Sequence, residues 1–219
     1  MYKRELIFIS GPTGAGKTTF STALFNIMVR KGHKVCYKSF TAFPLFSYTF
    51  FKALVILFYG LKVVRYHEDV RIHPSTLFIL RVKKLPKPII VLFMLFESLN
   101  MILSFYLKVI LACISRRVLI VDEGFPNMIA NYIEIFGKNS AFLIALIMAF
   151  VLKLRQKFKL LIIYVDAPDN VLLERWSTRG HPASTPVVNI THHLKYIHLV
   201  RFSKMMFSAI APLTEIYSA

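Results

Sequence analysis

The first forty residues alternate between short apolar runs and a stretch with helical spacing. Glu5 to Ile9 is an apolar run that predicts a buried strand. From Lys17 to Lys31 the apolar side chains recur with the period of a helix, and Gly32 follows as a residue that commonly ends one. Lys34 to Ser39 predicts a second strand. This order of strand, loop, helix and strand is typical of the start of a parallel α/β sheet.

Long apolar runs dominate the middle of the chain. Residues 40–61 contain one charged residue and are too long for a strand, which predicts a helix. Residues 62–87 are basic and rich in proline, as in a loop-rich insertion or a short hairpin. Residues 89–115 predict a second long helix, and residues 140–152 a third that is short for a membrane span. Because these helices are apolar on all sides, they lie either in a protein core or in lipid.

Three further strands are expected in the second half. Val118 to Val121 is apolar and ends in Asp122-Glu123, and Leu160 to Val165 is a continuous apolar run of the kind that is buried on both faces. A helix follows the second of these strands. Leu213 to Ser218 is long enough for only a brief last strand.

The loop after the first strand carries the most specific chemistry. It reads Gly11-Pro-Thr-Gly-Ala-Gly-Lys-Thr18, which is the pattern of a phosphate-binding P-loop. Its glycines let backbone N–H groups turn toward a di- or triphosphate, which also faces the N-terminus of the next helix. Lys17 adds a positive charge at the transferring phosphates. The predicted nucleotide-binding residues are Gly11, Thr13, Gly14, Ala15, Gly16, Lys17, Thr18 and Thr19.

Asp122 is the second chemical element. In a P-loop protein, an acid at the carboxyl end of a buried strand lies beside the P-loop, where it can bind Mg²⁺ directly or through water. We therefore predict that Thr18 and Asp122 form the metal site, with Glu123 next to it. The alternative is an ordinary turn that ends the strand.

Two arginines follow the later strand. Arg175 and Arg179 are one helical turn apart, so they can face the same way, and Gly180 begins a loop after them. Residues 175–190 are therefore predicted to form a lid that closes over phosphates. A solvated basic face is the alternative. The candidate catalytic set is Lys17, Asp122, Glu123, Arg175 and Arg179.

Composition narrows the choice of partner. The 219 residues are 56% hydrophobic, yet the net charge is +17. This combination indicates an anionic partner, either a phosphate substrate or acidic lipid headgroups. Nucleic acid is not expected, because no recognition motif or dense basic run is present. The basic residues at 153–159 form either a solvated rim or a contact with anionic lipid.

Location and partners are predicted less directly. Cys36 and Cys113 lie in apolar stretches without metal-ligand spacing, so buried thiols in a reducing compartment are expected. The first strand starts within a few residues of the amino terminus, which predicts a cytoplasmic protein without a signal peptide. The long apolar segments leave two arrangements open: a soluble or membrane-surface protein, or a hairpin of the first two segments across a membrane. A homodimer also stays open.

Three blocks of the sequence resemble the thymidylate-kinase-like branch of P-loop nucleotide kinases. They are residues 11–18 with 32–35, residues 118–123, and residues 165–168 with 173–175 and 179–180. Residues 40–115 look more like the apolar middle of uncharacterised, mainly archaeal relatives, including the setting of Glu97. The resemblance implies a P-loop three-layer sandwich with a mainly parallel sheet, in one domain of residues 1–219 whose apolar insertion, residues 40–115, lies on the acceptor side. It also implies ATP as donor and Mg²⁺ at Thr18 and Asp122.

The chain departs from that family where the acceptor binds. Thymidylate kinases usually carry an arginine after the strand acid, and this chain has Glu123; the acid-proline-glycine segment after the second strand is replaced by Ser39 to Pro44. An acid repels an acceptor phosphate but accepts a proton from a hydroxyl or orients water. The leading interpretation is Mg²⁺-dependent phosphoryl transfer from ATP to a small, hydrophobic hydroxyl acceptor, not thymidylate. The alternative is a membrane-associated P-loop NTPase or a nucleotide-switched binding protein.

Two weaker signals remain. Glu97 lies in an apolar helix, where an acid is costly without a partner, so it either pairs with another group or contacts substrate. His192, His193 and His198 lack the pattern of a metal site and are expected on an exposed helix.

Overall fold

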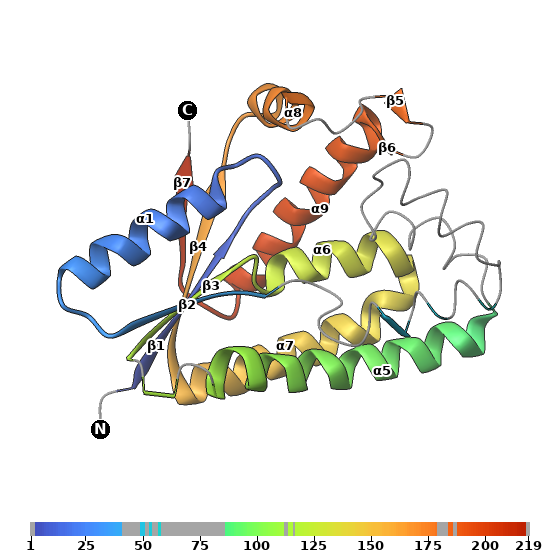
Figure 1. Cartoon of the computed structure of the whole chain (residues 1–219). Helices are drawn as coiled ribbons and strands as arrows, with labels where there is room; N and C mark the ends of the chain where they lie inside the picture. The colour runs from blue at the N-terminus through green and yellow to red at the C-terminus, as the bar shows by residue number, and fades with distance from the viewer. Residues whose placement is uncertain are drawn as a thin grey trace.

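A five-stranded parallel sheet forms the centre of the computed structural model, which describes residues 3–40, 49–50, 53, 57, 86–111, 114–115, 117–178, 184–185 and 188–217. The strand order is β2-β3-β1-β4-β7, and all four pairings are parallel. The predicted α/β sandwich with a parallel sheet is confirmed, including its short last strand (Figure 1). The strands are β1 (Arg4–Ser10), β2 (Val35–Ser39), β3 (Val118–Asp122), β4 (Phe158–Asp166) and β7 (Leu213–Tyr217).

Alternate side chains of β1 face two different helical layers, because successive residues of a strand point to opposite faces. Ile7 and Ile9 pack in the core that includes residues of helix α1 (Lys17–Arg30). Leu6 and Phe8 pack in a larger core on the other face. Three helices supply most of that second layer: α5 (Lys87–Phe105), α6 (Phe125–Phe136) and α7 (Ala141–Lys157).

Two further helices follow β4. Helix α8 (Asp169–Thr178) begins directly after the strand, and the long helix α9 (Ile190–Ser208) leads to β7. In Figure 1, α9 lies beside α6, and Val200 of α9 packs with Ala130 of α6 and Tyr164 of β4. A small antiparallel pair, β5 (Ser184–Thr185) with β6 (Val188–Asn189), lies between α8 and α9, within the predicted lid.

The predicted end of the first helix is confirmed. Gly32 has a φ of 80°, and the His33 N–H donates to the Met28 carbonyl at 3.0 Å. This backbone bond and the left-handed glycine are the marks of a Schellman ending, which glycine adopts without a Cβ clash.

Helix α5 lies between β2 and β3, as predicted for the second apolar segment. It continues as a π-helical stretch at Tyr106–Leu111. The first predicted apolar helix, residues 40–61, falls mostly outside the described residues, although residues 49–50, 53 and 57 are helical; residues 62–85 also lie outside them. Two stretches, Lys87–Leu111 and Phe125–Lys157, have the length and composition of a membrane span. The second comprises α6 and α7 joined by a 3₁₀ turn at Gly137–Ser140.

Two expectations about single side chains are wrong. Cys36 is disulfide-bonded, so it is not the free thiol that its apolar surroundings indicated; Cys113 lies outside the described residues. His193 is buried, and its ring stacks on Trp176 with centroids 4.7 Å apart, whereas an exposed position was expected. The contact joins α9 to α8, and no local pattern in the sequence signals it.

Candidate functional site

The P-loop connects β1 to α1 and has the backbone that its glycines predict. Gly11, Gly14 and Gly16 all have positive φ, of 145°, 93° and 87°. At Gly11 space is also limiting, because an added Cβ would lie 1.9 Å from the Val165 carbonyl oxygen of the neighbouring strand β4. A side chain at this position would therefore displace either the loop or the sheet.

Lys17 starts α1 and points back into the loop. Its side chain is buried, and Nζ donates to the Pro12 carbonyl at 2.8 Å. The ammonium therefore lies inside the turn that the P-loop makes. Of the other predicted loop residues, Thr13 is half-buried, Ala15 is buried with its N–H donating to the Pro12 carbonyl at 3.2 Å, and Thr18 and Thr19 are exposed on the first turn of α1.

Asp122 ends β3 beside the P-loop, as the sequence predicted. It pairs in register with Ile9, one residue before the end of β1. Asp122 Oδ2 accepts hydrogen bonds from Thr18 Oγ1 at 3.1 Å and from the Tyr37 hydroxyl at 2.9 Å. Asp122 Oδ1 is buried and has no hydrogen-bond partner within the described part of the chain. This oxygen and the Thr18 hydroxyl are the oxygen donors that a hard cation such as Mg²⁺ prefers, so the residues fit that ion.

Tyr37 is a site residue that the sequence analysis missed. It projects from β2, and its hydroxyl lies 3.3 Å from Ser21 Oγ as well as bonding Asp122. Burial raises the pKa of Tyr37, and the hydrogen bond to Asp122 raises it further, against a lowering by the Ser21 hydrogen bond. The hydroxyl therefore stays protonated and orients the carboxylate.

Glu123 follows Asp122 in an unusual conformation. Its φ of 68° is the one positive value at a non-glycine residue among the described residues, and such a backbone costs on the order of 1 kcal/mol or more. The Glu123 N–H donates to the Ile9 carbonyl at 3.0 Å, which extends the sheet by one bond. At Gly124 the chain passes so close to Phe8 that an added Cβ would lie 2.5 Å from the ring. The close packing at Gly124 and the left-handed turn at Glu123 place two successive acids at one strand end.

Asn127 of α6 holds the start of the P-loop and was also missed. Its Oδ1 accepts from Ser10 Oγ at 2.5 Å and from the Gly11 N–H at 3.3 Å, and its Nδ2 donates to the Gly11 carbonyl at 2.9 Å. Tyr196 of α9 adjoins the same group. Burial raises the pKa of Tyr196, hydrogen bonds to Asn127 and Asn131 lower it, and the charges of Glu123 and Glu134 raise it.

Arg175 lies across the loop from Lys17. Its Nη1 donates to the Gly14 carbonyl at 3.3 Å, so α8 reaches the middle of the P-loop. Lys17, Thr18, Asp122 and Arg175 are therefore brought together around one loop. Arg179 and residues 180–183 and 186–187 of the predicted lid lie outside the described residues.

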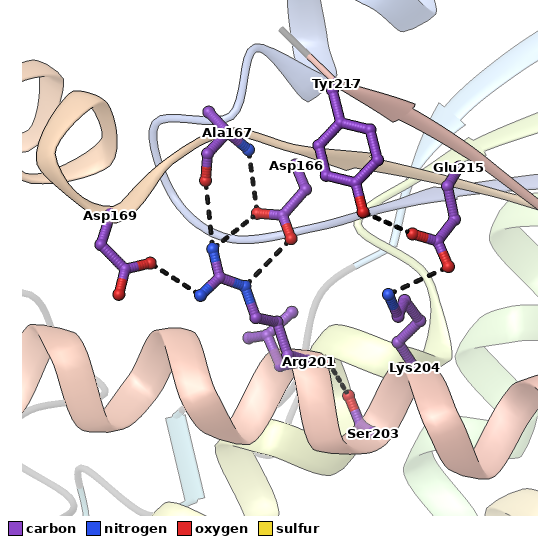
Figure 2. Close-up of polar contacts among 9 residues, drawn as sticks. Asp166, Ala167, Asp169, Arg201, Ser203, Lys204, Glu215 and Tyr217 are labelled. Carbon is purple, nitrogen blue, oxygen red and sulfur yellow. Dashed lines mark hydrogen bonds and ion pairs between the residues drawn. The ribbon is translucent and has the colours of Figure 1, made fainter.

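Arg201 fixes the turn that carries α8 (Figure 2). From α9 it donates to both oxygens of Asp166, at 3.0 and 3.2 Å, to Asp169 Oδ1 at 2.7 Å, and to the Ala167 carbonyl at 3.1 Å. The hydrogen bond to Asp166 is the main cause that raises the pKa of Arg201. Since α8 begins at Asp169, Arg201 indirectly positions Arg175. The two acids of the Asp-x-Pro-Asp sequence predict that a basic side chain pairs with them. The sequence alone does not show which of the 28 lysines and arginines this is.

Glu97 is fully buried on α5, where it accepts a hydrogen bond from the Tyr132 hydroxyl of α6. This supports the first of the two roles predicted for it, pairing with an internal group. The bond ties α5 to α6.

The comparisons with known proteins add little to this geometry. No protein-family model matches the sequence, and no curated protein matches it. Two similar solved structures are described as deoxyadenosine kinase from M. mycoides, one with bound dCTP and one with bound dATP. Each is 14% identical and aligns over 97% of this chain, with 89% and 90% of the other chain covered and TM-scores of 0.47 and 0.46. The assignment to a P-loop α/β fold therefore rests on the strand order and on the glycine loop between β1 and α1.

Proposed function

We propose that this chain is a Mg²⁺-dependent phosphotransferase that transfers the γ-phosphoryl group of ATP to a hydroxyl of a small acceptor. The observation that carries the proposal is the pair of acids at the end of β3. Asp122 reaches Thr18 across the sheet edge, and Glu123 follows in a left-handed turn. In this proposal Asp122 would serve the bound nucleotide, and Glu123 would face the acceptor.

The donor nucleotide would be held by the P-loop. Its backbone N–H groups and the N-terminus of α1 face the phosphates, and Lys17 stabilises the negative charge that develops on the transferring group. The bond from Lys17 to the Pro12 carbonyl would be exchanged for one to phosphate. Arg175 already lies at Gly14, and Arg179 with residues 175–190 would complete the cover from the lid.

Thr18 and Asp122 would hold the Mg²⁺ ion that accompanies the nucleotide. The ion supplies neutralisation of phosphate charge when it is bound. Tyr37 would keep Asp122 Oδ2 oriented, so that the buried Oδ1 faces the metal environment.

Glu123 would act as the base for the acceptor. As the acceptor oxygen bonds to the γ-phosphorus, the bond to the bridging oxygen of ADP breaks, and the acceptor proton moves to the Glu123 carboxylate. A negative side chain at this position disfavours an acceptor that already carries a phosphate, such as thymidylate.

The test is ATP turnover by the full chain against a panel of nucleosides, nucleotides, sugars and polyprenols, with detection of both ADP and phosphorylated acceptor. Glu123→Gln should lower the transfer rate by about 10²- to 10⁴-fold. Glu174→Gln is a matched control, since Glu174 is an exposed acid on α8. Full turnover by Glu123→Gln would contradict the role of Glu123 as the base. Product formation by Asp122→Asn at the wild-type rate would contradict the role of Asp122 at the metal.

A membrane-associated NTPase or nucleotide-switched binding protein is the second candidate. The exposed apolar side chains along α5 favour it. In that case Glu123 would orient water, and phosphate release would proceed with no phosphorylated product from any member of the panel. Cytoplasmic location and a homodimer remain predictions under both functions.

A further inference from the structure

Helix α5 buries its polar side chains and exposes apolar ones, which is the opposite of what a water-soluble helix does. Between residues 91 and 105 the polar side chains all lie on the buried face, which they share with apolar core residues. The exposed side chains of the same stretch are all apolar, and Leu99 reaches 71% exposure. The buried polar residues are Glu97, Ser98, Asn100 and Ser104; the exposed apolar residues are Val91, Leu92, Leu95, Leu99 and Leu103.

The buried polar groups explain why the helix does not turn over. Glu97 accepts a hydrogen bond from Tyr132 of α6, which ties the rotation of α5 to its neighbour. The bonds from Ser98 Oγ to the Met94 carbonyl, at 2.7 Å, and from Ser104 Oγ to Asn100 Oδ1, at 3.5 Å, lie within α5 and satisfy its other buried polar groups. Rotation of α5 to bury its leucines would carry Glu97 away from Tyr132. The leucine face is therefore held outward, although an outward face is normally polar in water.

Helix α7 continues this apolar surface. The two helices contact each other near their ends, where Phe105 of α5 packs on Phe150 of α7 with ring centroids 5.5 Å apart. Nearer its start α5 packs on α6, through Phe93 on Phe136. Helices α5 and α7 lie side by side at the edge of the molecule away from α1 (Figure 1). Phe142 and Leu152 of α7 are exposed. On α5 the apolar surface extends from Val91 to Leu103, about 18 Å at 1.5 Å per residue.

Exposed lysines border both ends of this surface. Lys87 and Lys138 lie where the two helices begin, and Lys108, Lys153 and Lys157 lie where they end. Residues 87–111 and 137–157 contain one acid, the buried Glu97. The border is thus purely cationic, which complements anionic headgroups, whereas a second copy of the same surface would bring like charges together.

We propose that the outward face of α5 and α7, with its lysine border, binds the surface of an anionic lipid bilayer, with both helices lying along the membrane plane. Each helix buries its other side against the sheet, as in a helix that lies in the interface. A spanning arrangement would instead require lipid around the buried Glu97 and Asn100. The proposal does not depend on the reaction catalysed at the P-loop.

The experiment is flotation of the full chain with vesicles of phosphatidylcholine alone, or with phosphatidylglycerol added. Anionic vesicles should bind more tightly, by about fivefold for each lysine near the surface, and high salt should weaken the binding. The triple variant Leu95→Asn, Leu99→Asn, Leu103→Asn should bind on the order of a hundredfold more weakly. Its thermal unfolding and circular dichroism should match the wild type, because the three leucines are exposed.

A control variant separates this face from exposed apolar residues in general. Phe202→Asn with Met205→Asn changes two exposed residues of α9 and should leave flotation unchanged. Absence of wild-type flotation, equal binding to neutral and anionic vesicles, or full binding by the triple variant would each overturn the proposal. Binding that resists both salt and alkaline extraction would indicate spanning helices instead. Self-association without lipid that the triple variant abolishes would assign the face to a second copy.

Discussion

Helices α1 and α5 cover opposite faces of the same sheet and meet the surroundings differently. The exposed residues of α1 are mixed, with Thr22, Asn26 and Arg30 alongside Ile27. Those of α5 between residues 91 and 105 are apolar throughout. Both helices bury apolar side chains against β1, so the difference lies in what each presents outward. Because the sheet separates the two cores, the outer faces of the two helices can differ independently.

The polar groups of α1 and α5 also differ in what they contact. At α1, Lys17 and Thr18 lie at the carboxyl edge of the sheet, where they bond the Pro12 carbonyl and Asp122. At α5, Glu97 faces inward and fixes the helix against α6. The first arrangement places polar groups at the P-loop, and the second holds an apolar surface toward the outside. Lys17→Ala tests whether the two sides are separable, and three further substitutions test how the P-loop side is built.

Of the four substitutions, Lys17→Ala should have the largest effect. Loss of a charge that acts on the transition state should lower ATP turnover by about 10²- to 10³-fold. Turnover is measured at saturating ATP, with the exposed Lys31→Ala as control. Vesicle flotation should not change, and a parallel loss of flotation would contradict the separation of the two sides.

Gly11→Ala tests the backbone of the P-loop rather than its charge. The new Cβ would overlap the Val165 carbonyl, and the alanine would have to adopt a φ of 145°. We therefore expect a loss of about 3 kcal/mol in the free energy of unfolding. Chemical denaturation measures it. Gly16→Ala is the matched control, since it has positive φ but no atom within 4 Å of the added Cβ, and it should cost less.

Arg201→Met should weaken the link between α9 and the turn before α8. Because Asp166 is buried, loss of its partner should cost about 2 kcal/mol of stability, and misplacement of Arg175 should raise the KM for ATP. The measurements are denaturation and steady-state kinetics. Lys204→Met, which removes the neighbouring bond to Glu215 at 3.1 Å, is the control (Figure 2). An unchanged KM would show that Arg201 acts on stability alone.

Tyr37→Phe should have the smallest effect, and one that depends on pH. Near neutral pH the loss of the bond to Asp122 should cost about 1 kcal/mol. The folded-state pKa of Tyr37 is raised, so the unfolded chain loses this proton first as pH rises; the contribution is complete below about pH 10 and declines above it. Chemical denaturation from neutral pH to above pH 10 should show that the difference in the free energy of unfolding between wild type and variant becomes smaller. A constant gap would contradict the raised pKa.

Local pattern was enough to predict the P-loop side of the sheet. The P-loop glycines, Lys17 and the apolar strands before Asp122 and Asp166 are contiguous in the chain, and each needs only its own backbone geometry to be recognised. The parallel sheet then brings the strand ends to one edge, so the pairing of Thr18 with Asp122 followed from topology. Helix α6 was not predicted, although Pro126 in its first turn and the helical spacing of its apolar residues are local signals of a helix.

The contacts that the sequence did not predict join segments far apart in the chain. Arg201 to Asp166, Asn127 to Gly11, Tyr37 to Asp122 and His193 to Trp176 each depend on where two elements pack, and many residues of the same kind were available to each partner. The exposed face of α5 could not be predicted either. The helix carries apolar residues on both faces, so its periodicity does not indicate which face is buried.

The sequence by itself therefore determined a P-loop, a parallel sheet and two acids at one strand end, since glycine backbone freedom and strand periodicity are local properties. Only the tertiary structure decided that Glu97 pairs with Tyr132 and that the leucines of α5 face outward. The physical reason is that burying a carboxylate requires a hydrogen-bond partner, and that partner exists on one side of the helix, against α6.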